Sequence, residues 1–273
     1  MIHISFSMNR RGRFQLAALL GTSAVLAATL WAPPMGAASP QAATPSAVTY
    51  QVGDALALDE FDRTGHSLGR ALVGGRWATA SPTGLLTLAG GAATWSGFTR
   101  GQTTHAWLPA VSASDQVLVA SFSFGVVSRA HYGMSHRTVL RRQTNGDGYV
   151  TAASVLSNGQ VSLGLSRVSN RVITSLARVP VAATLTTGKV LNVQTRVVGS
   201  TRVQLLARVW VVGAPKPGWQ IAYTDSSPQA IRSPGAVGVN AYMGSVGAGR
   251  AVTLTRLISR ELVAPAQRLE GPV

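Results

Sequence analysis

The residues best suited to chemistry lie in a polar run at 59–81. Its carboxylates and imidazole are those of Asp59, Glu60, Asp62 and His66. Such groups, a few residues apart, could act as general acid and general base or could bind a metal ion. The same run contains Phe61, a Gly-Gly pair and Trp77, which is typical of a β-strand followed by a tight corner, because glycines permit positive φ angles before a buried indole. We therefore interpret the run as structural, with Phe61 and Trp77 packing inward.

The other carboxylates do not form the pair that glycoside hydrolysis requires. A retaining glycosidase needs two carboxyl groups about 5 Å apart on one face of the protein. After Asp62 the acidic residues are scattered, and they are Asp115, Asp147, Asp225, Glu261 and Glu270. Retaining hydrolysis is therefore disfavoured, and we predict no catalytic residues.

The segment 131–142, HYGMSHRTVLRR, contains the arginine, histidine and tyrosine side chains that a polysaccharide lyase could use. Its spacing matches no lyase motif, so a lyase is an alternative that ranks ahead of a hydrolase. His131 and His136 have no acidic or cysteine side chains close by in the sequence. We interpret both as surface histidines, and we expect no metal and no cofactor.

The N-terminal region resembles an export signal. A basic segment at 9–13 precedes an apolar run at 14–32, and small residues follow. We predict a signal peptide and cleavage region at 1–43, with the new N-terminus between 37 and 47, and a flexible linker at 44–56. Arg13 disfavours a twin-arginine signal, so we expect general secretion and no membrane association after cleavage. An uncleaved membrane anchor is the alternative, because the apolar run is nearly long enough to span a bilayer.

The composition excludes some exported classes and indicates a partner of negative charge. The chain contains no cysteine, so it can be neither a lipidated lipoprotein nor a disulfide scaffold. Lysine and arginine number 24 against 9 acidic residues, and the balance is still +12 once the three arginines of the export signal are removed. This charge favours anionic polymers as partners. The alternative is codon usage, because almost all the cations are arginines scattered singly along the chain.

The pattern after the linker is that of antiparallel β-structure. Short apolar or alternating runs end at turn signals, as in 116–127, and no amphipathic helix is evident. The turns at 157–159 and 199–201 each contain a glycine and predict hairpins. In 203–211 the odd-numbered residues are all apolar and the even-numbered ones include Arg208 and Trp210, so one face should be core and the other should carry a guanidinium beside an indole.

An ordered set of motifs resembles a known family. These motifs are GRWATASPTG, LRRQTNGDGYVTAASVLSNGQVSLGLSRV and LLARVWVVGAPKPGWQIAYTDSSPQAIRSPGAVGVNAYMGSVGAGRAVTLTRL. Together they are similar to the concanavalin A-like, LamG-like jelly-roll module of secreted actinobacterial proteins, over roughly residues 59–259. The resemblance implies an all-β, two-sheet antiparallel jelly-roll sandwich, which we place at 57–262, with a C-terminal tail at 263–273.

Two positions depart from the family pattern. Lys216 stands where the family usually has a glutamate, and 255–257 reads Thr-Arg-Leu where an acidic pair is usual. A calcium site shared with Asp59 and Glu60 is therefore not expected.

The resemblance also implies that ligands meet the concave sheet face or the loops at its rim. Aromatic rings stack on sugars, and arginines bind carboxylate or sulfate groups at two points. Our predicted ligand-binding residues are Tyr149, Arg208, Arg142, Trp210 and Tyr132. We predict a secreted, non-catalytic module that binds extracellular or cell-surface polysaccharide, including anionic polymers, and no nucleic acid. A lyase or hydrolase of the same fold and a structural surface or matrix protein are the alternatives; the glycan and the oligomeric state are left open.

Overall fold

The structure is a computed structural model that describes residues 49–81, 85–125, 134–156, 158–244 and 251–264. Every element in these ranges is a β-strand. None of them contains a helix that is long and apolar enough to cross a bilayer. The predicted export signal, His131 and Tyr132 lie outside the described residues.

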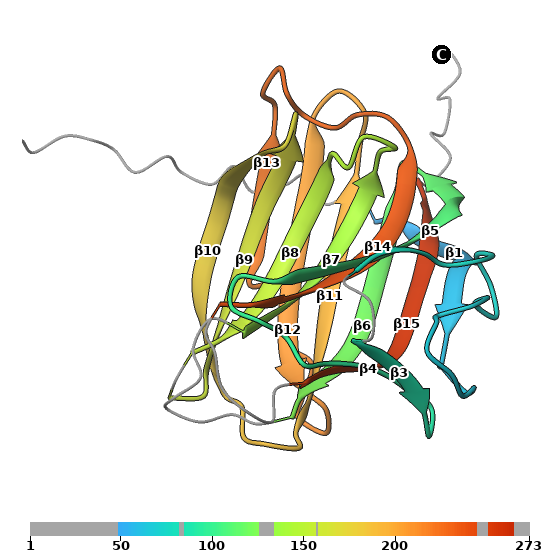
Figure 1. Ribbon diagram of the computed structural model, residues 1–273. Helices are drawn as coiled ribbons and strands as arrows, with labels where there is room; N and C mark the ends of the chain where they lie inside the picture. The colour runs from blue at the N-terminus through green and yellow to red at the C-terminus, as the bar shows by residue number, and fades with distance from the viewer. Residues whose placement is uncertain (1–48, 82–84, 126–133, 157, 245–250, 265–273) are drawn as a thin grey trace, which may run out of the picture. The chain divides into compact units, whose positions relative to one another are not determined.

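The first sheet has eight strands, and strands that lie side by side in it come from distant parts of the chain (Figure 1). Its order is β13 (Ile221–Asp225), β12 (Val203–Val211), β11 (Val190–Val198), β6 (Gln116–Phe124), β15 (Ala251–Val263), β4 (Ala92–Ser96) and β3 (Leu86–Ala89). The eighth strand, β1 (Gln51–Asp59), also pairs with β15. We call this the eight-stranded sheet.

The seven-stranded sheet forms the second layer. Its order is β10 (Val172–Thr184), β9 (Gln160–Ser169), β8 (Gly148–Val155), β7 (Met134–Arg142), β14 (Gly235–Met243), β5 (Thr103–Ala113) and β2 (Ala78–Ala80). The strands pair antiparallel in both sheets. The predicted two-sheet antiparallel sandwich is therefore confirmed.

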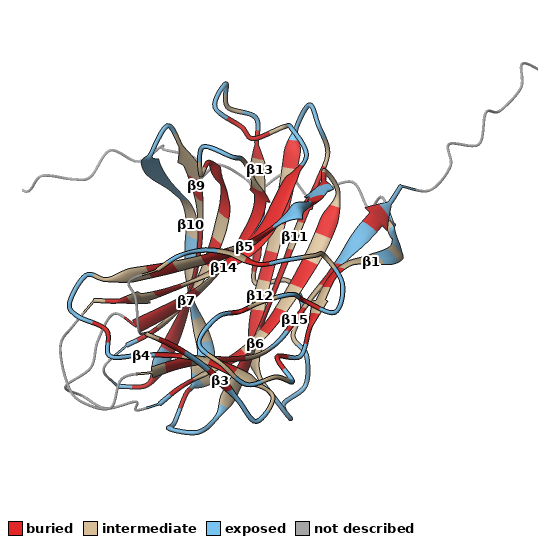
Figure 2. Cartoon of the chain, turned by 45° about the vertical axis from the view of Figure 1, so that its right-hand side comes forward, coloured by how far each residue is buried: buried red, intermediate tan, exposed pale blue. Residues whose placement is uncertain are grey.

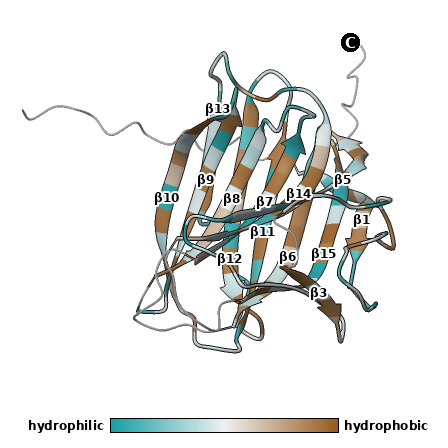
Figure 3. Cartoon of the chain, viewed as in Figure 1, coloured by the Kyte–Doolittle hydropathy of each residue, from teal (hydrophilic) through white to brown (hydrophobic). Residues whose placement is uncertain are grey.

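The core lies between the two layers, because alternate side chains of each strand point inward. In β12 the residues Val203, Leu205, Ala207 and Val209 are buried while the even-numbered ones are partly exposed, as the alternation predicts. Figure 2 shows buried positions along the facing strands, and Figure 3 shows apolar residues in both sheets. The predicted hairpins are present, with Gly159 and Gly199 at φ angles of 81° and 89° in their turns.

The polar run at 59–81 is structural, as we interpreted it. Asp59 is buried, and its carboxylate accepts hydrogen bonds from the Trp77 indole at 2.6 Å and from both terminal nitrogens of Arg63 at 2.7 and 2.8 Å. Phe61 and Trp77 are buried and their rings lie 6.2 Å apart. This carboxylate orients an indole and an arginine in the wall of the core.

The first strand begins earlier than we expected. We predicted a flexible linker at 44–56, but β1 begins at Gln51, which pairs with Val263 of β15. Pairing with a long neighbour supplies the backbone hydrogen bonds of this segment, and sequence composition alone does not reveal that neighbour.

His136 is not at the surface, so that prediction was wrong. Its side chain lies in the core, and its ring stacks on Phe122 with 4.1 Å between centroids and 17° between planes. Neither ring nitrogen has a hydrogen-bond partner among the described residues. Burial lowers the pKa of His136 from 6.5 to about 3, because a charged imidazole would lose its hydration there.

The buried imidazole should make the fold sensitive to acid. Below pH 6.5 the unfolded chain takes up a proton at His136 that the folded chain refuses, so stability falls as the pH drops from 6.5 towards 3 and is intact above 6.5. Between pH 7 and pH 5 the wild type should lose about 2 kcal/mol more than His136→Phe, measured by urea unfolding. An equal loss in both proteins would show that other groups cause the acid sensitivity.

Candidate functional site: a cationic groove on the seven-stranded sheet

Tyr149 cannot offer its ring to a ligand. It lies on the inward face of β8 and is buried; its hydroxyl donates to Asp225 at 2.9 Å and accepts from the backbone amide of Ile231 at 3.0 Å. Burial raises the pKa of this hydroxyl well above 10. Tyr149 and Arg208 were both among the predicted ligand-binding residues, but they share no face, because Arg208 belongs to the other sheet.

Arg208 and Trp210 lie together on β12, on the face of the eight-stranded sheet that points away from the core. The Arg208 guanidinium lies 4.1 Å from the Trp219 ring and 6.0 Å from the Trp210 ring. It donates to the side chain of Gln194 at 2.7 Å and to the carbonyl of Pro217 at 2.9 Å. These contacts hold the arginine against the sheet, and no contact links it to Arg142 on the opposite sheet.

Arg142 is the predicted residue that lies in a groove. The groove has a volume of about 560 Å³ and crosses the outer face of the seven-stranded sheet from β10 to β2. No aspartate or glutamate is found among its described lining residues, whereas four arginines are. These arginines are Arg137, Arg142, Arg171 and Arg178.

One cross-strand row forms the floor of the groove. The strand registers place one residue of each of the seven strands in this row, namely Arg178, Gly164, Ala152, Arg137, Asn240, His105 and Ala80. Two small residues thus separate the two arginines, whose strands are ~14 Å apart at a spacing of ~4.8 Å per strand. A Cβ at Gly164 would stand 3.7 Å from Nε of Arg178, which is ordinary contact distance, so the arginine lies over this part of the floor.

A contact with an aromatic ring and a hydrogen bond position Arg137 in the groove. The Arg137 guanidinium lies 4.6 Å from the Tyr242 ring and donates to Ser135 at 3.2 Å. Burial lowers the pKa of Arg137 and of Arg142, yet a guanidinium stays charged at neutral pH. Burial also lowers the pKa of His105, and the positive charges of these two arginines lower it further. His105 is therefore neutral at pH 7.

A bulge in β7 turns Arg142 towards the groove. Arg141 has a φ angle of 50°, and the register with β14 shifts between Ala236 and Gly238. Arg141 consequently points into the protein while Arg142 points outward into the groove. Only a glycine fits opposite the bulge, because a Cβ at Gly235 would stand 2.5 Å from the Arg141 carbonyl carbon.

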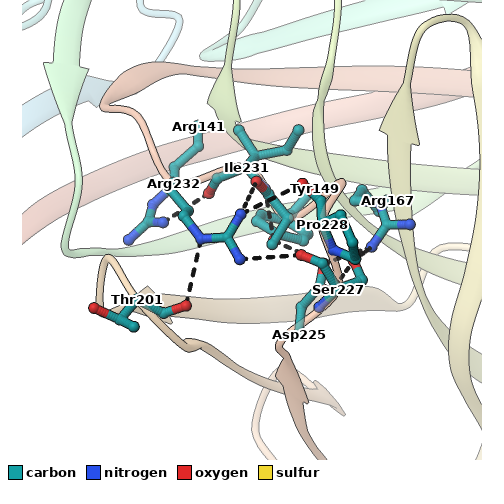
Figure 4. A network of polar contacts seen from close by, with 10 residues as sticks. Arg141, Tyr149, Arg167, Thr201, Asp225, Ser227, Pro228, Ile231 and Arg232 are labelled. Atoms are coloured by element: carbon teal, nitrogen blue, oxygen red, sulfur yellow. Dashed lines mark hydrogen bonds and ion pairs between the residues drawn. The ribbon is translucent and has the colours of Figure 1, made fainter.

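The buried Arg141 guanidinium joins segments of both sheets. It donates to the carbonyls of Ser114, Ile231 and Gly199 at 2.7–2.8 Å, and it forms an ion pair of 3.3 Å with Asp115. Figure 4 shows this side chain beside a second cluster centred on the Asp225 carboxylate. That carboxylate accepts hydrogen bonds from the side chains of Tyr149, Arg167 and Ser227. The two clusters together fix the end of the sandwich next to the bulge.

Sequence reasoning missed most of the groove. Among the predicted site residues only Arg142 lies in it, and Tyr132 lies outside the described residues. The described residues contain no group of three His, Cys, Asp or Glu side chains that could hold a metal ion. Arg178 had a signal in sequence, because it stands at an outward position between the apolar, inward-packing Ala177 and Val179. Arg137 had none, because its buried neighbours His136 and Thr138 are polar, and no local pattern reveals that the two arginines share a row.

No protein-family model matches the chain, and no curated protein matches it. The fold is similar to the CBM2 module of the Lactobacillus casei BL23 phage J-1 evolved Dit, with a TM-score of 0.54, 11% identity, and coverage of 80% of this chain and 99% of that one. It is also similar to the exoplasmic/lumenal domain of VIP36 in its Ca²⁺/Man3GlcNAc-bound form, with a TM-score of 0.50, 11% identity, and coverage of 72% and 88%. A xylan β-1,4-xylosidase from Bacillus halodurans C-125 gives a TM-score of 0.48 at 14% identity, over 75% of this chain and 39% of the enzyme. At 11% identity the first two similarities, with TM-scores of 0.54 and 0.50, show the fold alone.

Replacing the arginine behind the bulge should destabilise the protein. Arg141→Met removes the donor from one buried and two half-buried carbonyls and the partner of Asp115, so we expect the free energy of unfolding to fall by roughly 3–5 kcal/mol in urea titrations. Arg232→Met is the matched control, because Arg232 is partly exposed and its hydrogen bonds to the carbonyls of Thr201 and Pro228 are exposed; it should cost about 1 kcal/mol. Equal losses of unfolding free energy in the two variants would show that the Arg141 hydrogen bonds contribute no more to stability than those of Arg232.

Proposed function

We propose that this chain is a secreted, non-catalytic module that binds an anionic extracellular polysaccharide in the groove of the seven-stranded sheet. The observation that carries the proposal is the set of four arginines on a lining without aspartate or glutamate among its described residues. A guanidinium binds carboxylate or sulfate at two points, which neutral sugars do not offer. The export-like N-terminus supports secretion.

The rest of the lining suits a sugar chain. Small and apolar side chains such as Ala152 and Val150 form the floor on which the C–H faces of sugar rings can pack. The hydroxyls of Ser154, Ser166 and Ser175 can exchange hydrogen bonds with sugar hydroxyls. The similar structures named above, a carbohydrate-binding module and a domain bound to Man3GlcNAc, support a glycan as the ligand class.

The affinity should depend on salt and on the groove arginines. Binding to alginate or polygalacturonate should weaken as the Debye length falls from ~10 Å at 0.1 M salt to ~3 Å at 1 M. Arg178→Gln should lower the affinity roughly tenfold at low salt, because an exposed cation that lies over the floor is lost without loss of packing. Titration calorimetry measures both effects.

Arg208→Gln is the control for this experiment, since it removes the same charge from the opposite sheet. We expect it to keep the wild-type affinity and salt dependence. If Arg208→Gln weakens binding and Arg178→Gln does not, the ligand lies on the eight-stranded sheet. If no polymer of a glycan array binds, the proposal fails and a structural surface protein becomes the better interpretation.

A lyase is the second candidate, and one observation favours it. Neutral His105 lies in the same cross-strand row as Asn240 and Arg137. In an eliminative cleavage the arginine and the amide would bind the uronate carboxylate, and His105 would take the proton from C5. The C5–H electron pair would form the C4–C5 double bond, the C4–O bond would break, and solvent would protonate the leaving oxygen.

Ultraviolet absorbance separates the two functions, because elimination creates an unsaturated sugar. A binding module should leave the absorbance of alginate and polygalacturonate unchanged over long incubation. Absorbance that grows with wild type and stops with His105→Ala, in a protein that still binds, would establish the lyase instead. His66→Ala, at a histidine outside the groove, is the matched control.

A further inference from the structure

A second hollow adjoins the groove. It has a volume of about 190 Å³, and its lining includes Trp107, Ser112, Gln143, Thr144 and Pro234. Arg142 lines both the hollow and the groove. The two spaces therefore meet at a single side chain, and a ligand in one of them reaches the other by passing Arg142.

Arg142 is held as a flat platform at this meeting point. Its guanidinium carbon lies 3.9 Å from the centre of the Trp107 ring, and one terminal nitrogen donates to the carbonyl of Gln143 at 3.1 Å. The other two guanidinium nitrogens form no hydrogen bond with the described residues. A planar cation with one face on an indole presents its free N–H groups along its edge, where a carboxylate or sulfate can accept two of them.

The backbone on either side of the Arg142–Trp107 stack fixes the positions of these two side chains. A Cβ at Gly238 would stand 2.6 Å from the Ala106 carbonyl oxygen and 3.0 Å from Cβ of Trp107, so β5 and β14 approach closely there because residue 238 is a glycine. On the other side, the β7 bulge sets the direction of Arg142. The indole and the guanidinium thus come from two strands, β5 and β7, that both pair with β14.

We propose that the site binds interior segments of its polymer, with one acidic group on Arg142 and the sugar chain continuing from the groove into the second hollow. A ligand no longer than one of the two spaces would fill only that space. A chain that passes over the Arg142–Trp107 stack fills both, and the polar groups of Ser112, Gln143 and Thr144 meet its hydroxyls. This inference rests on the proposed function and adds to it the part of the polymer that is recognised.

Oligogalacturonates of increasing length test the proposal, with the full chain as purified. Wild-type affinity should rise by roughly tenfold once the oligomer extends beyond the groove, a gain of about 1.4 kcal/mol. Ser112→Trp fills the hollow with an indole, so it should abolish that rise while leaving the affinity for the shortest binding oligomers unchanged. Ser96→Trp adds the same side chain to an exposed position on the eight-stranded sheet and should behave as wild type.

Chemical reduction of the terminal sugar gives a second readout. Interior recognition predicts equal affinity for native and reduced oligomers, whereas loss of binding after reduction would overturn the inference. Affinity that does not depend on length would also overturn it, and the proposed function would stand. No binding at any length would overturn both proposals.

Discussion

A buried guanidinium at the end of β7 determines how the site is built. Arg141 occupies a left-handed backbone conformation and is buried in the core, where its charge is compensated by carbonyl oxygens and one carboxylate. Taking a guanidinium out of water is expensive, so it is tolerated only where nearly every N–H group finds an acceptor. The resulting bulge displaces the alternation of the strand by one residue, and this shift presents Arg142 to solvent. The internal cation thereby positions the external one.

The groove shows how a sheet can concentrate positive charge without destabilising itself. Two of its arginines lie over aromatic rings, Arg137 on Tyr242 and Arg142 on Trp107. Such stacking buries the apolar faces of the guanidinium and leaves its edges hydrated. Mutual repulsion between Arg137 and Arg178 is reduced because these two cations stand on separate strands, with Gly164 and Ala152 between them. An anion that enters the groove finds donors already oriented, so little side-chain entropy is lost on binding.

Local patterns predicted the elements of this fold, and long-range pairing decided the site. Alternation and turn glycines predicted β12 and the hairpins at Gly159 and Gly199 correctly, because both signals act within a few residues. The groove depends on β14, a late strand that inserts between β7 and β5, and no local signal reveals that order. Tyr149 was assigned to the wrong face because its strand is apolar on both faces, with Val150 and Ala152 outward. His136 was misplaced because a polar residue in a core is the exception to burial rules.

The pairing of Gln51 with Val263 has a consequence for how this module could be joined to other structures. The first and last strands of the sandwich lie next to each other in the eight-stranded sheet, and the groove is on the other sheet. Segments that precede β1 and follow β15 therefore depart from neighbouring points of the layer opposite the groove. A partner fused to either end, or a host domain that accepts the sandwich as an insertion, would attach on that side. The groove of the seven-stranded sheet would then be unobstructed and able to contact an extended surface such as a cell wall.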